Sequence, residues 1–431
     1  MYDTIIVGGG SSGLQLGALL SGVEGERVLV LEKSSRLGGR ANVVEKDGFI
    51  VDYGVHLIRF GPKSAVSRTC RMLGHEVQYN ALGTSWVFDI DGKAKVFPTS
   101  PKQFVSTRLI SKKDLLTKGL PLILKTKRGD HSPYMGTTVD AWLDEKGVSG
   151  GLRRYFHMVS ASMQVCPFLE KSSAGEMLTN MQKVLKEGIS VMYPRGGWKP
   201  LFQLWKDTVK RQGGIRTSTT VEKISLQGDC AVGVVADGEL IKAGSVVLSL
   251  PVCKLPELLP QETEASFVEM CRKTRPTAGI VLDYGLKERV SDMAGLCYLY
   301  DPVSFGMFTS NIDPSLAPPG RQLFTFLQPV REELFNDRKQ LKEMEHILEQ
   351  ALFRVFPKME NAIQWKRALH LPVVDGAEVN VNQTMDKRPG FRVPGVKGLF
   401  LVGDSTAAPG AGGDIGHESV HLAYEAIKRS K

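Results

Sequence analysis

The sequence predicts an α/β protein with a Rossmann-like nucleotide-binding part, and three observations carry this prediction. The first is the order of strand, glycine-rich turn, helix and second strand in TIIVGGGSSGLQLGALLSGVEGERVLVLEK. The second is a later apolar strand that ends in Gly403 and Asp404 and leads into another glycine-rich turn and a helix. The third is a composition of 42% apolar and 23% charged residues over 431 positions, enough apolar material for a large core.

Three glycines after the first strand have distinct roles in the predicted turn. Gly8, Gly10 and Gly13 fit the pattern G-x-G-x-x-G. The first glycine allows a sharp turn, the second lets the backbone approach a pyrophosphate, and the third allows the helix to pack closely on the strand. Free N–H groups at the start of the helix then face the phosphate. The second strand ends in Glu32, where a carboxylate binds the ribose of an adenosine, so both FAD and NAD fit.

A second glycine turn follows the second strand. It contains Arg36, Gly38, Gly39 and Arg40, in SSRLGGRANVV. A glycine pair lets backbone N–H groups crowd round a phosphate, and an arginine adds fixed charge beside it. An ordinary surface turn is the alternative interpretation. The other amino-terminal candidates for cofactor binding are Lys33, Gly54 and His56.

The pattern R-x-G-G-R resembles the flavin-binding signature of the superfamily that holds phytoene desaturases, protoporphyrinogen oxidases and monoamine oxidases. Among these families the phytoene dehydrogenase-like proteins are the most similar in pattern. The resemblance implies that the cofactor is FAD. It also implies a discontinuous FAD-binding domain with an inserted α+β substrate domain.

The strand GLFLVGD and the turn after it supply the carboxyl-terminal half of the expected site. The resemblance assigns Asp404, with Gly403, to the ribityl chain or pyrophosphate of FAD. Gly412 and Gly413 leave room for a flat isoalloxazine ring against backbone. The last helix is expected from about Ile415, and its positive end would point at the flavin pyrimidine.

The resemblance also divides the chain into two expected domains. The FAD-binding domain is expected to comprise residues 1–80, 190–260 and 385–431. The substrate-binding domain is expected to comprise 81–189 and 262–384. Relatives hold the adenine with backbone at a position like Val221, which we expect at the end of a strand.

A flavin of this type exchanges a hydride at N5 with a carbon held over its face and passes electrons to an acceptor such as oxygen or a quinone. His56 and Lys387 are candidates for a catalytic role, and each equally fits a structural turn. No cysteine occurs after Cys297, which predicts non-covalent FAD. The paired aromatic residues of amine oxidases have no good match here, because the candidates are Trp365 and a helical residue, Tyr424.

A phytoene desaturase-like reaction on a large apolar isoprenoid or tetrapyrrole is therefore expected. The alternatives are a protoporphyrinogen oxidase-like or amine oxidase activity, a flavin-dependent double-bond reductase, and a binding protein without catalysis on the same fold. An NAD-dependent dehydrogenase is a weaker alternative, because it would leave the second and the carboxyl-terminal turns without a ligand.

Composition limits which binding partners and which cellular compartment we expect. The six cysteines are scattered without a CxxC pair or a His/Cys cluster, which argues against structural zinc and disulfides and predicts a reducing compartment. The net charge of +9 is spread along the chain and no nucleic-acid-binding module is visible, so we expect no nucleic-acid partner. We expect a cytoplasmic protein, because we find neither a leader peptide nor a run of eighteen apolar residues.

One basic and apolar segment, residues 108–128, suggests peripheral membrane contact. RLISKKDLLTKGLPLILKTKR mixes lysines with leucines and isoleucines, and Pro121 is expected to kink its helix. Such a helix can lie in a membrane interface with its apolar face down. The alternative is an ordinary lid helix with a solvated basic face.

Overall fold

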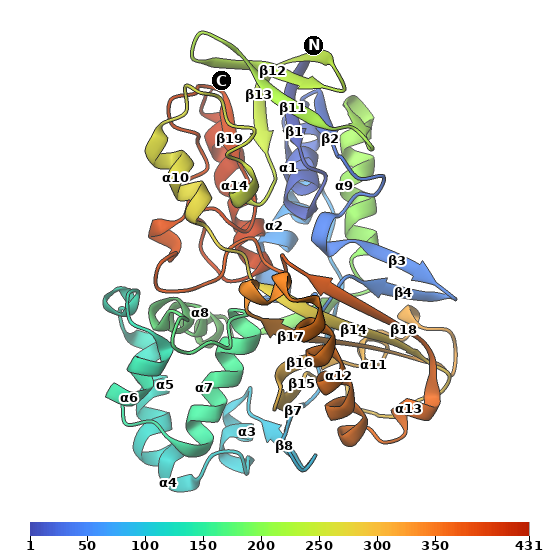
Figure 1. Ribbon diagram of the computed structural model, residues 1–431, viewed down its shortest axis with the longest axis vertical. Helices are drawn as coiled ribbons and strands as arrows, with labels where there is room; N and C mark the ends of the chain where they lie inside the picture. Colours follow the sequence, from blue (N-terminus) through green and yellow to red (C-terminus); the bar gives the residue numbers. More distant parts are fainter. Residues whose placement is uncertain (431) are drawn as a thin grey trace.

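The computed structural model describes residues 1–430 and has two lobes (Figure 1). Both chain ends lie in the upper lobe of that view, where β1, β2, β13, α1, α9 and α14 meet. The lower lobe holds a second large sheet and most of the helices between residues 100 and 190. The fold is thus mixed α/β, as the sequence predicts.

The upper lobe is built on a parallel sheet assembled from distant parts of the chain. Its parallel strands, in spatial order, are β10 (Gly214–Arg216), β2 (Val28–Leu31), β1 (Tyr2–Val7), β13 (Glu239–Leu248) and β19 (Leu399–Leu401). β13 continues into an antiparallel meander with β12 (Cys230–Ala236) and β11 (Val221–Gln227). Apolar residues on both faces of β1 and β2 explain this placement, since a parallel sheet is covered on both sides.

Helices cover the two faces of this sheet. Ile6 packs on the side of α1 (Ser11–Gly22), α9 (Lys199–Gln212) and α14 (Gly413–Lys428), with α2 (Ala65–Met72) beyond them. Ile5 points to the other face, where it packs in one cluster with α10 (Ala265–Lys273) and the meander. The alternation between neighbouring residues is that of a strand.

The lower lobe holds a second, largely antiparallel sheet of seven strands. In spatial order they are β18 (Ile363–Leu371), β14 (Ala278–Leu286), β17 (Gln322–Val330), β16 (Val303–Met307), β15 (Cys297–Tyr300), β7 (Ser85–Phe88) and β8 (Ala94–Phe97). Every residue of β14 and β17 is buried, because both faces of the sheet are covered.

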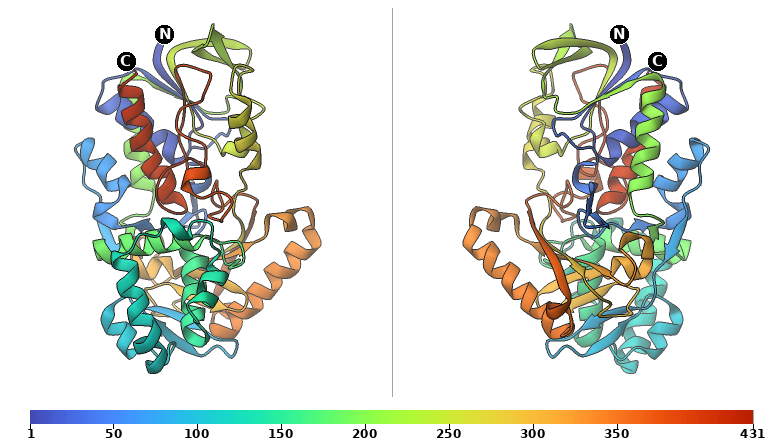
Figure 2. Two further views of the ribbon diagram at one scale, coloured as in Figure 1. Left: turned by 90° about the vertical axis from the view of Figure 1, so that its left-hand side faces the viewer. Right: turned by 90° about the vertical axis from the view of Figure 1, so that its right-hand side faces the viewer.

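Two groups of helices cover the second sheet from opposite sides (Figure 2). One side carries α12 (Arg338–Val355), with α11 (Thr309–Ile312) and α13 (Met359–Ala362) nearby. The other side carries α3 (Pro101–Ser106), α4 (Lys112–Asp114), α5 (Leu120–Arg128), α6 (Val139–Glu145), α7 (Gly150–Met163) and α8 (Ala174–Glu187). A π-helical turn, Leu115–Gly119, joins α4 to α5.

Short sheets connect the lobes. β3 (Val43–Lys46) and β4 (Phe49–Asp52) form a hairpin. β9 (Val191–Pro194) pairs with β5 (Ile58–Arg59) and β6 (Tyr79–Ala81). These segments carry the chain from the first nucleotide-binding turns to the lower lobe and back.

One expectation about a strand is wrong. Val221 begins β11 and does not end a strand, because the preceding strand stops at Arg216 and residues 217–220 turn the chain into the meander. The kink expected at Pro121 takes the form of the π turn, after which Pro121 lies in the first turn of α5. Within residues 1–430 no helix combines the length and the apolar sequence needed to cross a membrane.

Candidate functional site

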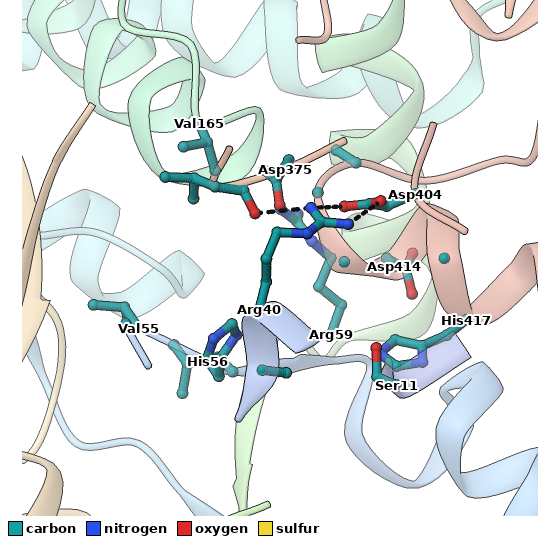
Figure 3. A pocket seen from close by; sticks show the side chains of 18 of the residues that line it. Ser11, Arg40, Val55, His56, Arg59, Val165, Asp375, Asp404, Asp414 and His417 are labelled. Carbon is teal, nitrogen blue, oxygen red and sulfur yellow. Dashed lines mark hydrogen bonds and ion pairs between the residues drawn. The ribbon is translucent and has the colours of Figure 1, made fainter. Parts of the chain in front are cut away.

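One cavity of about 1350 Å³ runs between the lobes and touches both glycine-rich ends of the chain. Its polar end is lined by the turns after β1 and β2 and by the turn before α14 (Figure 3). Of the predicted cofactor-binding residues, these line it: Gly8, Gly10, Glu32, Lys33, Gly38, Gly39, Arg40, Gly54, His56, Val221, Gly403, Asp404, Gly412 and Gly413.

The first turn has the geometry that its glycines predict. Gly8 has a φ of +110°, which side chains rarely tolerate. A Cβ on Gly13 would overlap the carbonyl oxygen of Gly8, so this glycine allows α1 to lie against β1. A Cβ on Gly10 would meet no protein atom within 4 Å, because Gly10 faces the cavity. No side chain caps the first turn of α1, which leaves its N–H groups available to a ligand.

The second turn is bound to the first. The N–H of Gly38 donates to the carbonyl oxygen of Gly9 at 2.8 Å, and Gly38 pairs with Gly10 in an isolated parallel bridge. A Cβ on Gly39 would lie 3.2 Å from the Cα of Gly10. The two turns therefore form one backbone cradle, with positive φ at both Gly38 and Gly39.

Glu32 closes the cradle at the end of β2. One carboxylate oxygen accepts from the N–H of Gly9 at 2.7 Å and the other from the N–H of Ser34 at 2.8 Å. The side chain is partly buried and lines the cavity, as does Val221 at the start of β11. This end of the cavity has the polar groups expected for the adenosine half of a dinucleotide.

Arg40 and Asp404 join the two ends of the chain. The guanidinium donates to both carboxylate oxygens at 2.6 Å and to the carbonyl oxygen of Val374 at 3.0 Å. The N–H of Gly376 donates to Asp404 at 2.8 Å. Burial alone would raise the pKa of Asp404, but Arg40 outweighs burial and holds that pKa below its ordinary value. Paired in this way, a carboxylate can stand beside a phosphate without net repulsion.

The carboxyl-terminal turn opens onto the same space. Gly403 and Gly412 have φ values of +140° and +60°. A Cβ on Gly403 or Gly413 would meet no protein atom within 4 Å. α14 begins at Gly413, two residues before the expected start at about Ile415, and its first turn has no side-chain cap. The bare backbone and the helix start face the cavity together, which suits a flat anionic ring.

Four candidates do not line the cavity. Gly13 lies beneath the turn, and Ile415 packs in a small cluster behind it. Arg36 is exposed. Lys387 is also exposed and donates to the carbonyl oxygen of Val381 at 2.7 Å, which fits a structural turn, the alternative to a catalytic role that the sequence leaves open. His56 does line the cavity, but its Nε2 pairs with the carbonyl oxygen of Tyr53 at 2.9 Å and burial lowers its pKa.

Three titratable residues in the cavity wall were not recognised from the sequence, namely Arg59, Asp375 and Asp414. A fourth is His417, for which the sequence leaves solvent and the flavin edge as alternatives. It is buried, stacks on Trp198 and bonds Gln15 at 2.7 Å, and burial lowers its pKa to about 4. Only the Gly-Asp step at Asp414, in the predicted turn, carried any signal in the sequence.

Asp375 has a fixed backbone and a free carboxylate oxygen. Thr277 forms two hydrogen bonds with the backbone of Asp375. The hydroxyl of Thr277 accepts from the N–H of Asp375 at 2.8 Å, and the N–H of Thr277 donates to the carbonyl oxygen of Asp375 at 3.1 Å. The side chain is 8% exposed, and Oδ2 has no hydrogen-bond partner among the described residues. Burial, together with the nearby Asp404, raises the pKa of Asp375 to about 7, although Arg40 and Arg59 oppose the rise.

Beyond these polar groups the cavity becomes an apolar chamber in the lower lobe. Its wall combines strands of the second sheet with α3, α7 and α8. Its large apolar members are Phe97, Phe104, Tyr155, Met163, Met181, Leu296, Tyr298, Phe305 and Leu327. Trp365 and Tyr424, the aromatic candidates from the sequence, are both buried elsewhere.

These features fit FAD. The cradle is bare backbone, Glu32 lies at its adenosine end, and the turn before α14 is open where a ring would rest. The cradle and the chamber form one continuous space.

Comparison with known proteins agrees with the geometry. A family model described as flavin containing amine oxidoreductase matches residues 12–416. The 4,4'-diapolycopen-4-al dehydrogenase of Metabacillus indicus is 22% identical over 412 residues, covering 84% of this chain and 82% of that protein. The zeta-carotene-forming phytoene desaturase of Myxococcus xanthus is 23% identical over 485 residues, covering 95% and 90%.

A solved structure of an oxidoreductase from Methanosarcina mazei has the same fold. Its TM-score is 0.84 at 22% identity, with 98% of this chain and all of that chain covered. Since the family model spans nearly the whole chain and both glycine turns meet in one cavity, this chain belongs to the flavin-containing amine oxidoreductase family and is an FAD-dependent oxidoreductase.

Proposed function

We propose that the protein moves a hydride between a carbon of a large apolar molecule, of isoprenoid or tetrapyrrole type, and N5 of the flavin. The observation that carries this proposal is the apolar chamber, which opens directly onto the glycine cradle. FAD supplies the hydride acceptor or donor when it is bound. Oxygen or a quinone is the electron acceptor that we expect.

The chamber supports an apolar substrate by its lining. Phe104 lies edge-on to Tyr155 with ring centroids 5.3 Å apart, and Phe97 lies 4.5 Å from Tyr298. Burial raises the pKa of both tyrosines, so their hydroxyls stay neutral at physiological pH. A neutral aromatic wall binds long apolar chains and excludes water. An amine cation among these apolar side chains would have no carboxylate partner.

Asp375 is the group that we propose takes or delivers the proton. Removing a hydride from one carbon and making a C=C bond requires loss of a proton from the next carbon. Asp375 lines the cavity, Thr277 fixes its backbone, and its buried Oδ2 has no hydrogen-bond partner among residues 1–430. Asp404 cannot serve, because Arg40 occupies both of its oxygens.

Anaerobic reduction of the bound flavin tests the substrate class. We expect a polyene precursor such as phytoene, or a porphyrinogen, to bleach the flavin absorbance within the turnover time, and amines such as putrescine to leave it unchanged. Bleaching by amines alone would overturn the proposal. If the reaction runs in the reverse direction, the chemically reduced enzyme is reoxidised by the matching unsaturated compound.

A matched pair of variants tests the chamber. Phe104 faces the chamber, whereas its neighbour Val105 is 71% exposed and lies outside the cavity wall. We expect Phe104→Asp to raise KM for the apolar substrate at least tenfold with unchanged flavin content, because it places a charge in the chamber. We expect Val105→Asp to change neither value in detergent solution. Equal effects of the two variants would contradict the assignment.

A further inference from the structure

The segment joining α4 to α5 presents a row of exposed leucines. The side chains of Leu116, Leu120 and Leu124 are 65%, 40% and 56% exposed. They follow one another at intervals of four residues, which places them on one face of the helical segment. The ring of Pro121, also exposed, lies beside Leu120. A solvated helix face is normally polar, so this row is unusual.

The fold does not need these leucines. The opposite face of the segment buries Leu115, Gly119, Leu122 and Thr126 and thereby fixes the helix to the lower lobe. The π turn widens the helix at residues 115–119 and accommodates Pro121, which lacks an N–H. The leucine row is therefore available to a partner, while the helix is held by its other side.

Basic side chains flank the row at both ends. Lys112 and Lys113 precede it and Lys127 and Arg128 follow it, all exposed, and none of the four forms an ion pair with a described residue. Asp114 is the one acidic residue between positions 108 and 128, and it accepts from the hydroxyl of Ser111 at 2.6 Å. The surface thus combines an apolar row with uncompensated positive charge.

We propose that this surface docks on an anionic phospholipid bilayer. The leucines enter the acyl boundary, and the flanking lysines and arginine contact headgroup phosphates. Charge complementarity favours lipid over a second copy of this chain, because pairing the face with itself would oppose two sets of positive charges in a protein of net charge +9. The docking itself does not depend on the proposed substrate.

The surface lies one helix away from the chamber. The side-chain amide of Gln182 in α8 donates to the carbonyl oxygens of Thr126 at 3.1 Å and Gly129 at 2.8 Å, which ties α5 to α8. Met181 and Leu185 of the same helix line the cavity. Figure 1 places α4 at the lower edge and α5 on the left-hand side of the lobe that holds the chamber. A bilayer on this face would therefore lie one helix away from the chamber wall.

Flotation of the holoprotein with lipid vesicles tests the proposal. We expect binding to vesicles of phosphatidylcholine with phosphatidylglycerol, at least tenfold weaker binding to phosphatidylcholine alone, and at least tenfold weakening in 0.5 M NaCl. Replacing Leu116, Leu120 and Leu124 together by Ser should reduce binding at least tenfold. Flavin content and Tm should stay unchanged, because those side chains face solvent.

A matched control removes three exposed apolar residues from other surfaces. Leu240, Ile347 and Leu422 are 49%, 49% and 37% exposed, and their combined replacement by Ser should leave vesicle binding unchanged. Equal binding by the Leu116/Leu120/Leu124 variant and the wild type would overturn the proposal. So would a wild-type dimer in lipid-free sedimentation velocity that this variant abolishes, since a second copy would then be the occupant.

Discussion

Two glycines three positions apart have opposite surroundings, which separates ligand binding from folding at the scale of single residues. Gly10 has an ordinary φ of −73° and open space where a Cβ would point. Gly13 has protein atoms at that position, among them the carbonyl oxygen of Gly8. A side chain at the first position meets only a ligand, and one at the second meets the strand beneath.

We therefore expect Gly10→Val to give a folded protein without flavin. Its Tm should match that of the wild-type apoprotein, and its absorbance should lack the flavin bands. Gly13→Val should reduce soluble yield or lower Tm sharply, because α1 can no longer lie on β1. Normal flavin content in the Gly10 variant would contradict the pyrophosphate assignment.

Asp375→Asn tests the proposed proton transfer. The amide keeps the shape of the side chain but cannot accept a proton, so flavin content should be unchanged and the rate of flavin reduction should fall at least about 100-fold. In the wild type this rate should rise with pH through about 7, where Asp375 ionises, and the variant should lose that dependence. A variant with wild-type rate and pH profile would exclude the role.

The same carboxyl should leave a signature in apoprotein stability. Its folded pKa of about 7 lies above the ordinary value of 3.8, so the native state binds more protons than the unfolded state between these values. Stability contributed by the neutral form is present below about pH 4 and is lost as pH rises through 7, by about 1.4 kcal/mol per unit of pKa difference. The Asn variant should therefore gain stability relative to wild type from pH 4 to pH 8 in urea titrations.

Some residues of the site can be recognised from neighbouring sequence, and others cannot. Gly8, Gly10 and Glu32 are recognisable because their spacing in one strand–turn–helix unit determines their placement. Asp375 and Arg59 are not recognisable, because they reach the cavity only when the two lobes pack. Lys387 is the opposite case, because it lies close to the final strand in sequence but not at the site. Its side chain donates to the carbonyl oxygen of Val381 and points away from the cavity.

At the scale of elements, β14 and β18 depend on a buried ion pair in their cross-strand register. Asp283 lies opposite Arg367 in the two strands. The guanidinium and the fully buried carboxylate form an ion pair at 2.7 Å. Arg367 also donates to the carbonyl oxygen of Asp52, which joins the β4 hairpin to the second sheet. Burial raises the pKa of Asp283 to about 6, while Arg367 opposes that rise.

Removing one partner should be costly and pH dependent. We expect Arg367→Ala to lower the free energy of unfolding by about 3 kcal/mol at pH 8, because a buried charge loses its partner. The loss should shrink at pH 5, where Asp283 takes up a proton. Asp283→Asn with Arg367→Met should recover most of the stability. As a control, Arg289→Ala breaks an exposed pair and should change stability by less than about 0.5 kcal/mol.

Helices and strands were predictable where the spacing of apolar residues followed one helical or strand period without interruption. β1, α1 and β2 follow from the strand–turn–helix–strand pattern at the amino terminus, and α14 is the helix expected after the last glycine turn. Val221 was misplaced because Thr217–Thr220 carries no apolar period, so β10 and the start of β11 could not be separated. The π turn was not visible either, since its hydrogen bonds depend on how Leu115 and Gly119 pack against the lobe.

At the scale of the whole molecule, the cofactor site exists only when both ends of the chain meet. Arg40 and Asp404 are 364 positions apart, yet they share two hydrogen bonds at the centre of the cavity. The sequence predicted this meeting because each end carries its own glycine turn. It did not predict the shape of the chamber, whose wall draws on six or more separate elements. The domain boundaries at 81, 190, 262 and 385 stay a proposal.

Hydrogen exchange should show that flavin stabilises both ends together. A ligand that binds only the folded cradle stabilises it by about 2.7 kcal/mol at a concentration 100 times its Kd. When FAD is added to apoprotein, we expect amide protection to rise in residues 8–14, 38–41 and 403–416 at the same flavin concentration, because all three line one cavity. Residues 338–355 of α12, on the far side of the second sheet, serve as the internal control and should not change. Protection confined to the amino-terminal turn would mean that the carboxyl-terminal turn does not share the ligand, and the Arg40–Asp404 pair would then be only a structural contact between the two ends.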